Sequence, residues 1–172
     1  MEEYIKLIKA FKLPRFNEIP NIELYMDQLL AYIEGVMVPI CDVDKEKPLT
    51  TSMVNNYVKQ GVIPPTCKKR YSREHIAYLI VICILKQIYS ITELGHLIAV
   101  QNSSYTIEIA YDYLCTELEN TLNSTFSNVP ILPDSGQTDK PERLLVRNSA
   151  IAFAHKLYTQ KLCEELYKNV NL

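Results

Sequence analysis

Apolar residues recur three and four positions apart over most of the chain, which is the spacing that places them on one face of an α-helix. Residues 76–85 form an uncharged apolar run, so a helix over 73–88 is predicted to be buried nearly all round. Further helices are predicted over 24–38, 91–100, 103–128 and 144–168. The chain has only four glycines and no tryptophan, whereas sheet-rich folds need more turn residues. The predicted fold class is therefore all-α.

A single apolar stripe runs along the predicted helix over 103–128. Residues 129–143 contain three prolines and form a loop before the last helix. We expect these two helices either to form a C-terminal helical hairpin, antiparallel and packed on its own head, or to exchange with those of a second subunit. The stripe consists of Ile107, Tyr111, Leu114, Leu118, Leu122 and Phe126.

A short amphipathic helix is predicted over 51–60, because hydroxyl residues cap its start and Gly61 stops it. Its apolar face holds Met53, Val54, Tyr57 and Val58. The opposite face has no carboxylate, although an ordinary surface helix usually mixes Glu with Lys. Amide and hydroxyl side chains hydrogen-bond base edges, and lysine attracts phosphate, so this face suits the DNA major groove. Its residues are Thr51, Ser52, Asn55, Asn56, Lys59 and Gln60.

The segment after this helix turns away, because the two prolines at 64–65 lack amide hydrogens. Residues 66–71 form a short basic stretch before Ser72, which is suited to cap a new helix. A hairpin-like wing is predicted here. It would hold three cations, Lys68, Lys69 and Arg70, near a phosphate strand.

The distribution of charge changes what the net charge implies. A net charge of -2 by itself argues against a nucleic-acid partner. Residues 50–73, however, contain five basic residues and no acidic one. A basic cluster is often only a solvated surface, so charge alone leaves both interpretations open. The five residues are Lys59, Lys68, Lys69, Arg70 and Arg73.

Other features argue against several classes of protein. The five cysteines lack metal-ligand spacing and indicate free thiols in a reducing cytosol. The longest uncharged apolar run, 76–85, is half the length of about twenty residues that a membrane span needs. A cytoplasmic protein without membrane contact is expected. No phosphate-binding glycine loop, histidine pair or nucleophile motif is found, so no enzyme activity, metal or cofactor is expected.

A resemblance to MerR-type regulators is carried by three stretches, TTSMVNNYVKQGVIPP at 50–65, KRYSREHI at 69–76 and YSITEL at 89–94. It implies a winged helix-turn-helix head. A closer resemblance, to the bacterial family called domain of unknown function 1836, is carried by LPRFNEIP at 13–20 and LYMDQ at 24–28.

The MerR-like pattern has two departures. Asn55 and Asn56 replace the usual Arg-Tyr pair, so the phosphate contacts of that pair are not carried over, whereas Tyr57 and Lys59 match the pattern. A charged loop at 42–48 also enlarges the turn before the 51–60 helix.

These observations predict a DNA-binding transcriptional regulator with an N-terminal helical segment over 1–48, a MerR-like head over 49–102 and a C-terminal region over 103–172. The alternative is a protein-interaction module that keeps a helix-turn-helix shape without specific DNA binding. The expected DNA contacts are Thr51, Ser52, Asn55, Asn56, Tyr57, Lys59, Lys68, Lys69, Arg70, Tyr71 and Arg73.

The partners expected are double-stranded DNA and a second copy of the chain. One recognition helix reads only about four base pairs, at ~1–3 kcal/mol each, which is too little to find one operator in a genome. A homodimer is therefore expected, with the 103–128 stripe as its surface unless that stripe packs on its own head. The MerR resemblance also implies an unknown small-molecule effector, for which Tyr105, Tyr111, Tyr113, Tyr158 and Tyr167 are candidate lining residues, although tyrosines at helical spacing are more often core residues.

Overall fold

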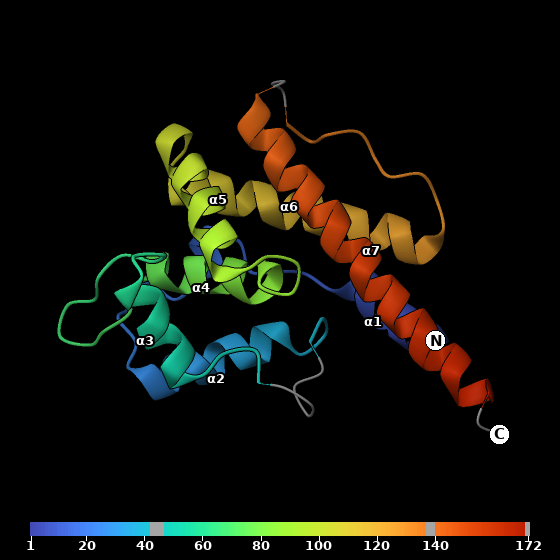
Figure 1. Ribbon diagram of the computed structural model, residues 1–172, viewed down its shortest axis with the longest axis horizontal. Coiled ribbons are helices and arrows are strands. Elements are labelled where there is room, and N and C mark those ends of the chain that lie inside the picture. Colours follow the sequence, from blue (N-terminus) through green and yellow to red (C-terminus); the bar gives the residue numbers. More distant parts are fainter. Residues whose placement is uncertain (42–46, 137–139, 171–172) are drawn as a thin grey trace.

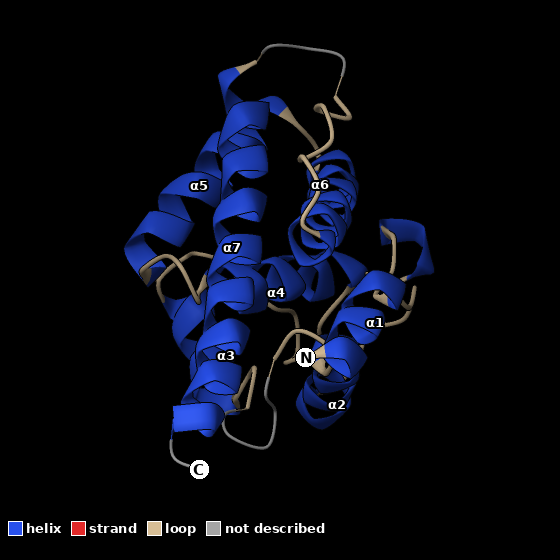
Figure 2. Cartoon of the chain, turned by 90° about the vertical axis from the view of Figure 1, so that its right-hand side faces the viewer, coloured by secondary structure: helices blue, strands red, loops and turns tan. Residues whose placement is uncertain are grey.

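The computed structural model describes residues 1–41, 47–136 and 140–170. In these ranges the chain is helical with no named strand, which confirms the all-α fold class (Figures 1 and 2). No helix in the described ranges is long and apolar enough to span a membrane. The elements are α1 Glu2–Ala10, a 3₁₀ turn η1 Phe16–Glu18, α2 Met26–Met37, α3 Thr51–Lys59, α4 Arg73–Leu85, α5 Ile91–Ser104, α6 Ile107–Ser127 and α7 Pro141–Val170.

Helix α4 lies at the centre of the molecule, as its uncharged sequence predicts. Every residue from Ile76 to Leu85 is buried, and α4 packs against α2, α6 and α7. One hydrophobic core extends from Ile8 in α1 to Leu157 in α7. The predicted N-terminal, head and C-terminal segments therefore share one core, and their boundaries remain predictions.

Helix α5 starts at a capping box, as the Ser90 and Glu93 spacing indicates. The Ser90 amide donates to Glu93 Oε2 at 2.7 Å, and the Glu93 amide donates to Ser90 Oγ at 3.3 Å. These hydrogen bonds from Ser90 stabilise the ionised carboxylate and lower the pKa of Glu93. The helix start is fixed locally, by residues three apart.

Helices α6 and α7 run in the same direction, so the predicted antiparallel hairpin is wrong. Glu117 is paired with Arg147, and the rings of Phe126 and Tyr158 lie 5.2 Å apart, so later residues of α6 meet later residues of α7. The connection between the two helices is 13 residues long, and its described part, residues 128–136, returns past α6, where Tyr113 Oη donates to Asp134 Oδ1 at 2.8 Å (Figure 2). A connection of this length can span about 40 Å, more than the ~31 Å length of α6.

The apolar stripe of α6 is internal to the chain. Its last five members are buried, and Ile107 is partly buried against the same core. Helix α6 packs on α1, α4 and α7. The prediction that this stripe forms a dimer surface is therefore wrong, because the chain covers the stripe itself.

Candidate nucleic-acid interface

Helix α3 forms where the sequence predicts it. Thr50 caps its start, since Thr50 Oγ1 accepts from the Met53 amide at 3.3 Å. The helix ends at Lys59, Gln60 is its C-cap, and Gly61 follows with a φ of 70°. Glycine is favoured at that position because other residues rarely adopt a positive φ.

The two faces of α3 separate as the sequence predicts. Val54 and Tyr57 are buried, and Met53 and Val58 are partly buried. The opposite face is exposed, and Gln60 Nε2 donates to Asn56 Oδ1 at 3.0 Å. This face presents Thr51, Ser52, Asn55, Asn56, Lys59 and Gln60.

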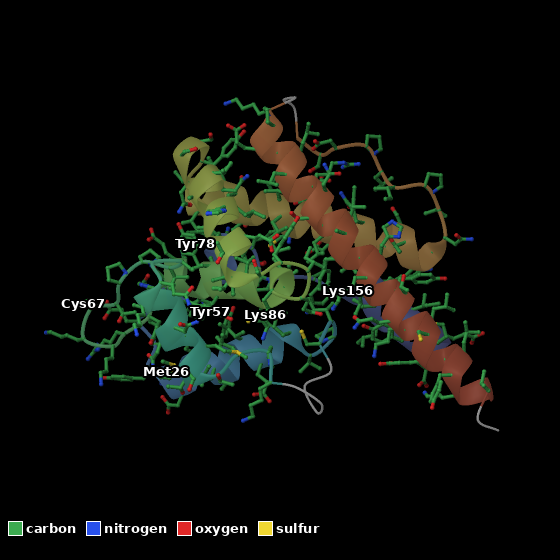
Figure 3. All side chains as sticks on the ribbon, in the orientation of Figure 1. Met26, Tyr57, Cys67, Tyr78, Lys86 and Lys156 are labelled. Atoms are coloured by element: carbon green, nitrogen blue, oxygen red, sulfur yellow. The ribbon has the colours of Figure 1, made fainter. Side chains whose placement is uncertain are left out.

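Tyr57 does not belong to the candidate interface. Its side chain points from α3 toward α4 (Figure 3), and only 6% of the residue is exposed. Burial raises the pKa of Tyr57. The expectation that Tyr57 contacts DNA is corrected, because its ring is on the same helix face as Val54, in the core.

The wing is a tight turn between α3 and α4. The Arg70 amide donates to the Cys67 carbonyl oxygen at 3.0 Å, and the two residues form an antiparallel bridge. Lys68 and Lys69 have φ values of 50° and 57°. Positive φ at both central residues is the requirement of a type I′ turn, which matches the twist of a β-hairpin. Cys67 lies on the loop that projects from the body (Figure 3).

The base of the wing is fixed by a second bridge, to a residue before α2. Leu24 and Tyr71 exchange two backbone hydrogen bonds, both 2.9 Å. Tyr71 is only 3% exposed, with its ring 5.9 Å from that of His75. The expectation that Tyr71 contacts DNA is therefore also corrected.

The five cations predicted as one group fall into three groups. Lys59, Lys68 and Lys69 are exposed and have no ion-pair partner in the described part of the chain. Arg70 donates to Tyr25 Oη at 3.0 Å and lies 3.7 Å from Glu23. The three exposed lysines are the cations most available to a phosphate.

Arg73 is engaged within the protein. Its Nε donates to the Ile19 carbonyl oxygen at 2.9 Å, and its Nη2 donates to that of Asn17 at 3.4 Å. Its guanidinium lies 5.6 Å from the centre of the Phe16 ring. Arg73 thus holds the N-terminal segment, and its role as a DNA contact stays a prediction.

Residues 14–114 match the model of a family described as "Domain of unknown function (DUF1836)". The chain belongs to the DUF1836 family. The matched region covers α2 to α5, the wing and the start of α6. Comparisons with curated proteins and with solved structures gave no match.

Sequence reasoning missed the residues before α2 that support the wing in this DUF1836 chain. Leu24 pairs with Tyr71, while Glu23 and Tyr25 contact Arg70. The only signal was negative: residues 19–23 fit no helical pattern and include Pro20, which favours extended backbone in the residue before it. Nothing in that stretch identifies its partner far along the chain.

The tyrosines considered for an effector pocket do not share one cavity. A cavity of about 30 Å³ lies between α4, α5, α6 and α7, and Tyr111 is the one of the five that lines it. Tyr105 and Tyr113 instead contact the Arg143 guanidinium, at 5.5 and 4.7 Å from their ring centres. The cavity beside Tyr111 is large enough for only about two water molecules. No ligand is assigned to it.

Proposed function

We propose that this DUF1836 chain is a DNA-binding transcriptional regulator with a winged helix-turn-helix of the MerR kind. In this proposal α2 and α3 form the helix-turn-helix, α3 reads the major groove, and the wing binds the phosphate backbone. The polar face of α3 supports the first role, because it offers amides, hydroxyls and a lysine without a carboxylate that would repel DNA.

The observation that carries the proposal is the identity of the two residues at the tip of the wing. A type I′ turn favours Asn-Gly at its two central positions. Most other residues cost roughly 1–2 kcal/mol each when their backbone is in the left-handed region. Lys68 and Lys69 occupy both positions, and both are exposed. Strained backbone of this kind concentrates at functional sites. Two ammonium groups at a projecting tip are suited to phosphate.

We also propose that the regulator acts as a homodimer. The last turns of α7 carry exposed apolar side chains, with Leu166 56% and Tyr167 68% exposed. This end of α7 lies far from α3 and the wing (Figure 1), so a second copy could pack there while both interfaces remain open. Leu166→Glu is expected to shift the protein from dimer to monomer in analytical ultracentrifugation. A wild-type protein that is monomeric at all concentrations would refute the dimer.

Selection of bound duplexes from a random library tests the function directly. The wild-type chain is expected to enrich a defined motif. Charge reversal of Lys68, Lys69 and Arg70 to Glu is expected to abolish binding at low salt. The matched control reverses three exposed lysines remote from the wing and from the proposed dimer surface, Lys6, Lys9 and Lys140, and is expected to retain most of the affinity. Equal losses in both triple variants would mean that only net charge matters.

A second candidate function is protein interaction without specific DNA binding. Two observations favour it. The net charge is -2, and the carboxylate of Glu23, before α2, lies 3.7 Å from Arg70 of the wing, where it would repel a phosphate. Under this alternative, the duplex library yields no motif, and the exposed face of α3 binds one stoichiometric protein partner instead.

A further inference from the structure

The segment between α1 and α2, residues 11–25, extends from helix α6 to the wing, and we call it the N-terminal strap. Most of its apolar residues are buried, with Leu13 2% and Ile19 1% exposed. Its two ends make specific polar contacts with different parts of the fold. The strap therefore connects the C-terminal region with the candidate DNA interface.

The end of the strap near α1 is held by one carboxylate. Arg15 donates to Glu119 through both Nη atoms, at 2.7 and 2.9 Å. Lys12 Nζ and the Leu13 amide donate to the same carboxylate, at 2.8 and 3.0 Å. Glu119 thus accepts four hydrogen bonds from three residues of the strap, Lys12, Leu13 and Arg15.

The Glu119 carboxylate is ionised in this environment. Its side chain is only 5% exposed, and burial acts to raise its pKa. The hydrogen bonds from Arg15, Lys12 and Leu13 outweigh this effect and hold the pKa of Glu119 below its usual range. We call this set of hydrogen bonds to the Glu119 carboxylate the clamp. Because the carboxylate is charged, removing it leaves the Arg15 guanidinium without its ion-pair partner.

The next part of the strap stays on α6. Tyr111 Oη donates to the Pro14 carbonyl oxygen at 2.8 Å, and the Phe16 amide donates to Asp112 Oδ1 at 2.8 Å. Phe16 also contacts the Arg73 guanidinium. At Phe16 the strap thus passes from contacts with α6 to contacts with the start of α4.

The far end of the strap is bonded to the wing. Arg73 donates to the Ile19 carbonyl oxygen, and the two Leu24 to Tyr71 hydrogen bonds follow. Leu24 is the backbone partner of the residue that directly follows the wing turn. Any displacement of the strap alters the partner against which the wing is aligned.

We propose that Glu119 is a positioning residue for the wing, acting through the N-terminal strap. It is a side chain of α6, outside the head, and touches neither the wing nor the face of α3. Loss of its charge releases Arg15 and Lys12, loosens the strap and leaves the wing aligned for only part of the time. DNA affinity then falls in proportion to the aligned fraction. The effect on affinity rests on the proposed DNA-binding function, whereas the mechanical coupling does not.

Glu117 provides a matched control two residues away. It is also a buried carboxylate of α6, with a side chain 0% exposed, but it pairs with Arg147 and accepts from Ser135. Among the described residues, Glu117 makes no hydrogen bond or ion pair with the strap. Glu117→Gln and Glu119→Gln therefore remove the same charge from the same helix, and only the second acts on the strap.

Amide hydrogen exchange tests the coupling without DNA. In Glu119→Gln the exchange of the Leu24 and Tyr71 amides is expected to accelerate by about tenfold or more relative to amides of α4. Glu117→Gln is expected to leave that ratio unchanged. Equal exchange ratios in the two variants would overturn the proposal. If Glu119→Gln fails to fold, Arg15→Gln breaks the same clamp from the partly exposed strap side and is expected to give the same pattern.

DNA titration tests the consequence for the interface. Glu119→Gln is expected to lower affinity by about two- to thirtyfold with no change in the salt dependence, since the phosphate contacts are the same. Lys68→Ala is expected to reduce the salt slope by about one. If the wild-type chain binds no DNA, the proposed function fails while the exchange result still decides the coupling. Wild-type affinity in Glu119→Gln would overturn the positioning role.

Discussion

Leu24 and Tyr71 each donate a backbone hydrogen bond to the carbonyl oxygen of the other, at 2.9 Å in both directions. This reciprocal pair fixes the position at which the chain leaves the wing and enters α4. The Cys67–Arg70 turn lies directly before it, so the geometry of the turn is set on one side by its own backbone and on the other by the strap.

Replacing the tip of the wing with Asn-Gly should stabilise the protein and weaken its binding to DNA. The double variant Lys68→Asn, Lys69→Gly places residues that tolerate a positive φ at both positions. Glycine loses more backbone entropy on folding, which offsets part of the gain, so the free energy of unfolding is expected to rise by about 1 kcal/mol. Loss of two cations should lower the salt slope of DNA binding by about two. Denaturant unfolding and DNA titration measure the two effects. Unchanged affinity would exclude the tip from the interface.

Gly61 and Gly35 should respond in opposite ways to substitution by alanine. A Cβ meets nothing within 4 Å at either site, so only the backbone conformation differs. Gly61 has a φ of 70°, and Gly61→Ala is expected to destabilise by about 1 kcal/mol. Gly35 is within α2, and Gly35→Ala is expected to stabilise by up to about 1 kcal/mol. Thermal unfolding provides the comparison, and shifts of the same sign would contradict it.

The cysteines should separate into reactive and inert groups. Cys67 and Cys163 are exposed, whereas Cys83 and Cys115 are buried. Burial raises the pKa of Cys83 and of Cys115 to about 12, and the thiolate is the reactive form. Timed alkylation at neutral pH with mass spectrometry is expected to label the exposed pair first. Rapid labelling of Cys115 in the folded protein would mean that α6 opens readily.

Acid should release the clamp on the N-terminal strap. The pKa of Glu119 in the folded protein is below the ordinary value of about 4.3 in the unfolded chain, so its ionised form stabilises the fold above that pH. This contribution is lost as the pH falls from about 4.3 through the folded-state pKa. Stability of Glu119→Gln should therefore depend less steeply on pH between about 5 and 3 than stability of the wild type. Parallel curves from denaturant unfolding would show that the clamp does not contribute.

Sequence reasoning predicted the features that depend on neighbouring residues. The cap at Thr50, the stop at Gly61 and the box at Ser90 and Glu93 each require residues only a few positions apart. The two faces of α3 follow from helical periodicity, which places Tyr57 on the buried face. The expectation that Tyr57 contacts DNA came from the MerR resemblance instead. Local chemistry determined these elements and their exposed faces.

The features that sequence reasoning missed depend on partners far along the chain. Glu117 and Glu119 look like ordinary surface residues, because no nearby position shows that Arg147 and Arg15 will meet them in the core. The direction of α7 is equally invisible, since the same apolar spacing suits a parallel or an antiparallel neighbour. The pairing of Leu24 with Tyr71 is set by the packing of the strap rather than by any local motif.

The parallel arrangement of α6 and α7 also has a consequence for folding. Two antiparallel helices can zip together from their turn, because the first contacts close a very short loop. Here the contact between Glu117 and Arg147 closes a loop of 30 residues, and the contact between Phe126 and Tyr158 gains nothing from a nearby turn. The first of these contacts to form must therefore meet the closure entropy of a loop of about 30 residues, whereas the first contact of an antiparallel hairpin closes only a few. Formation of this pair is therefore expected to be slow relative to the local helices, and shortening the 128–140 connection should impair folding rather than accelerate it.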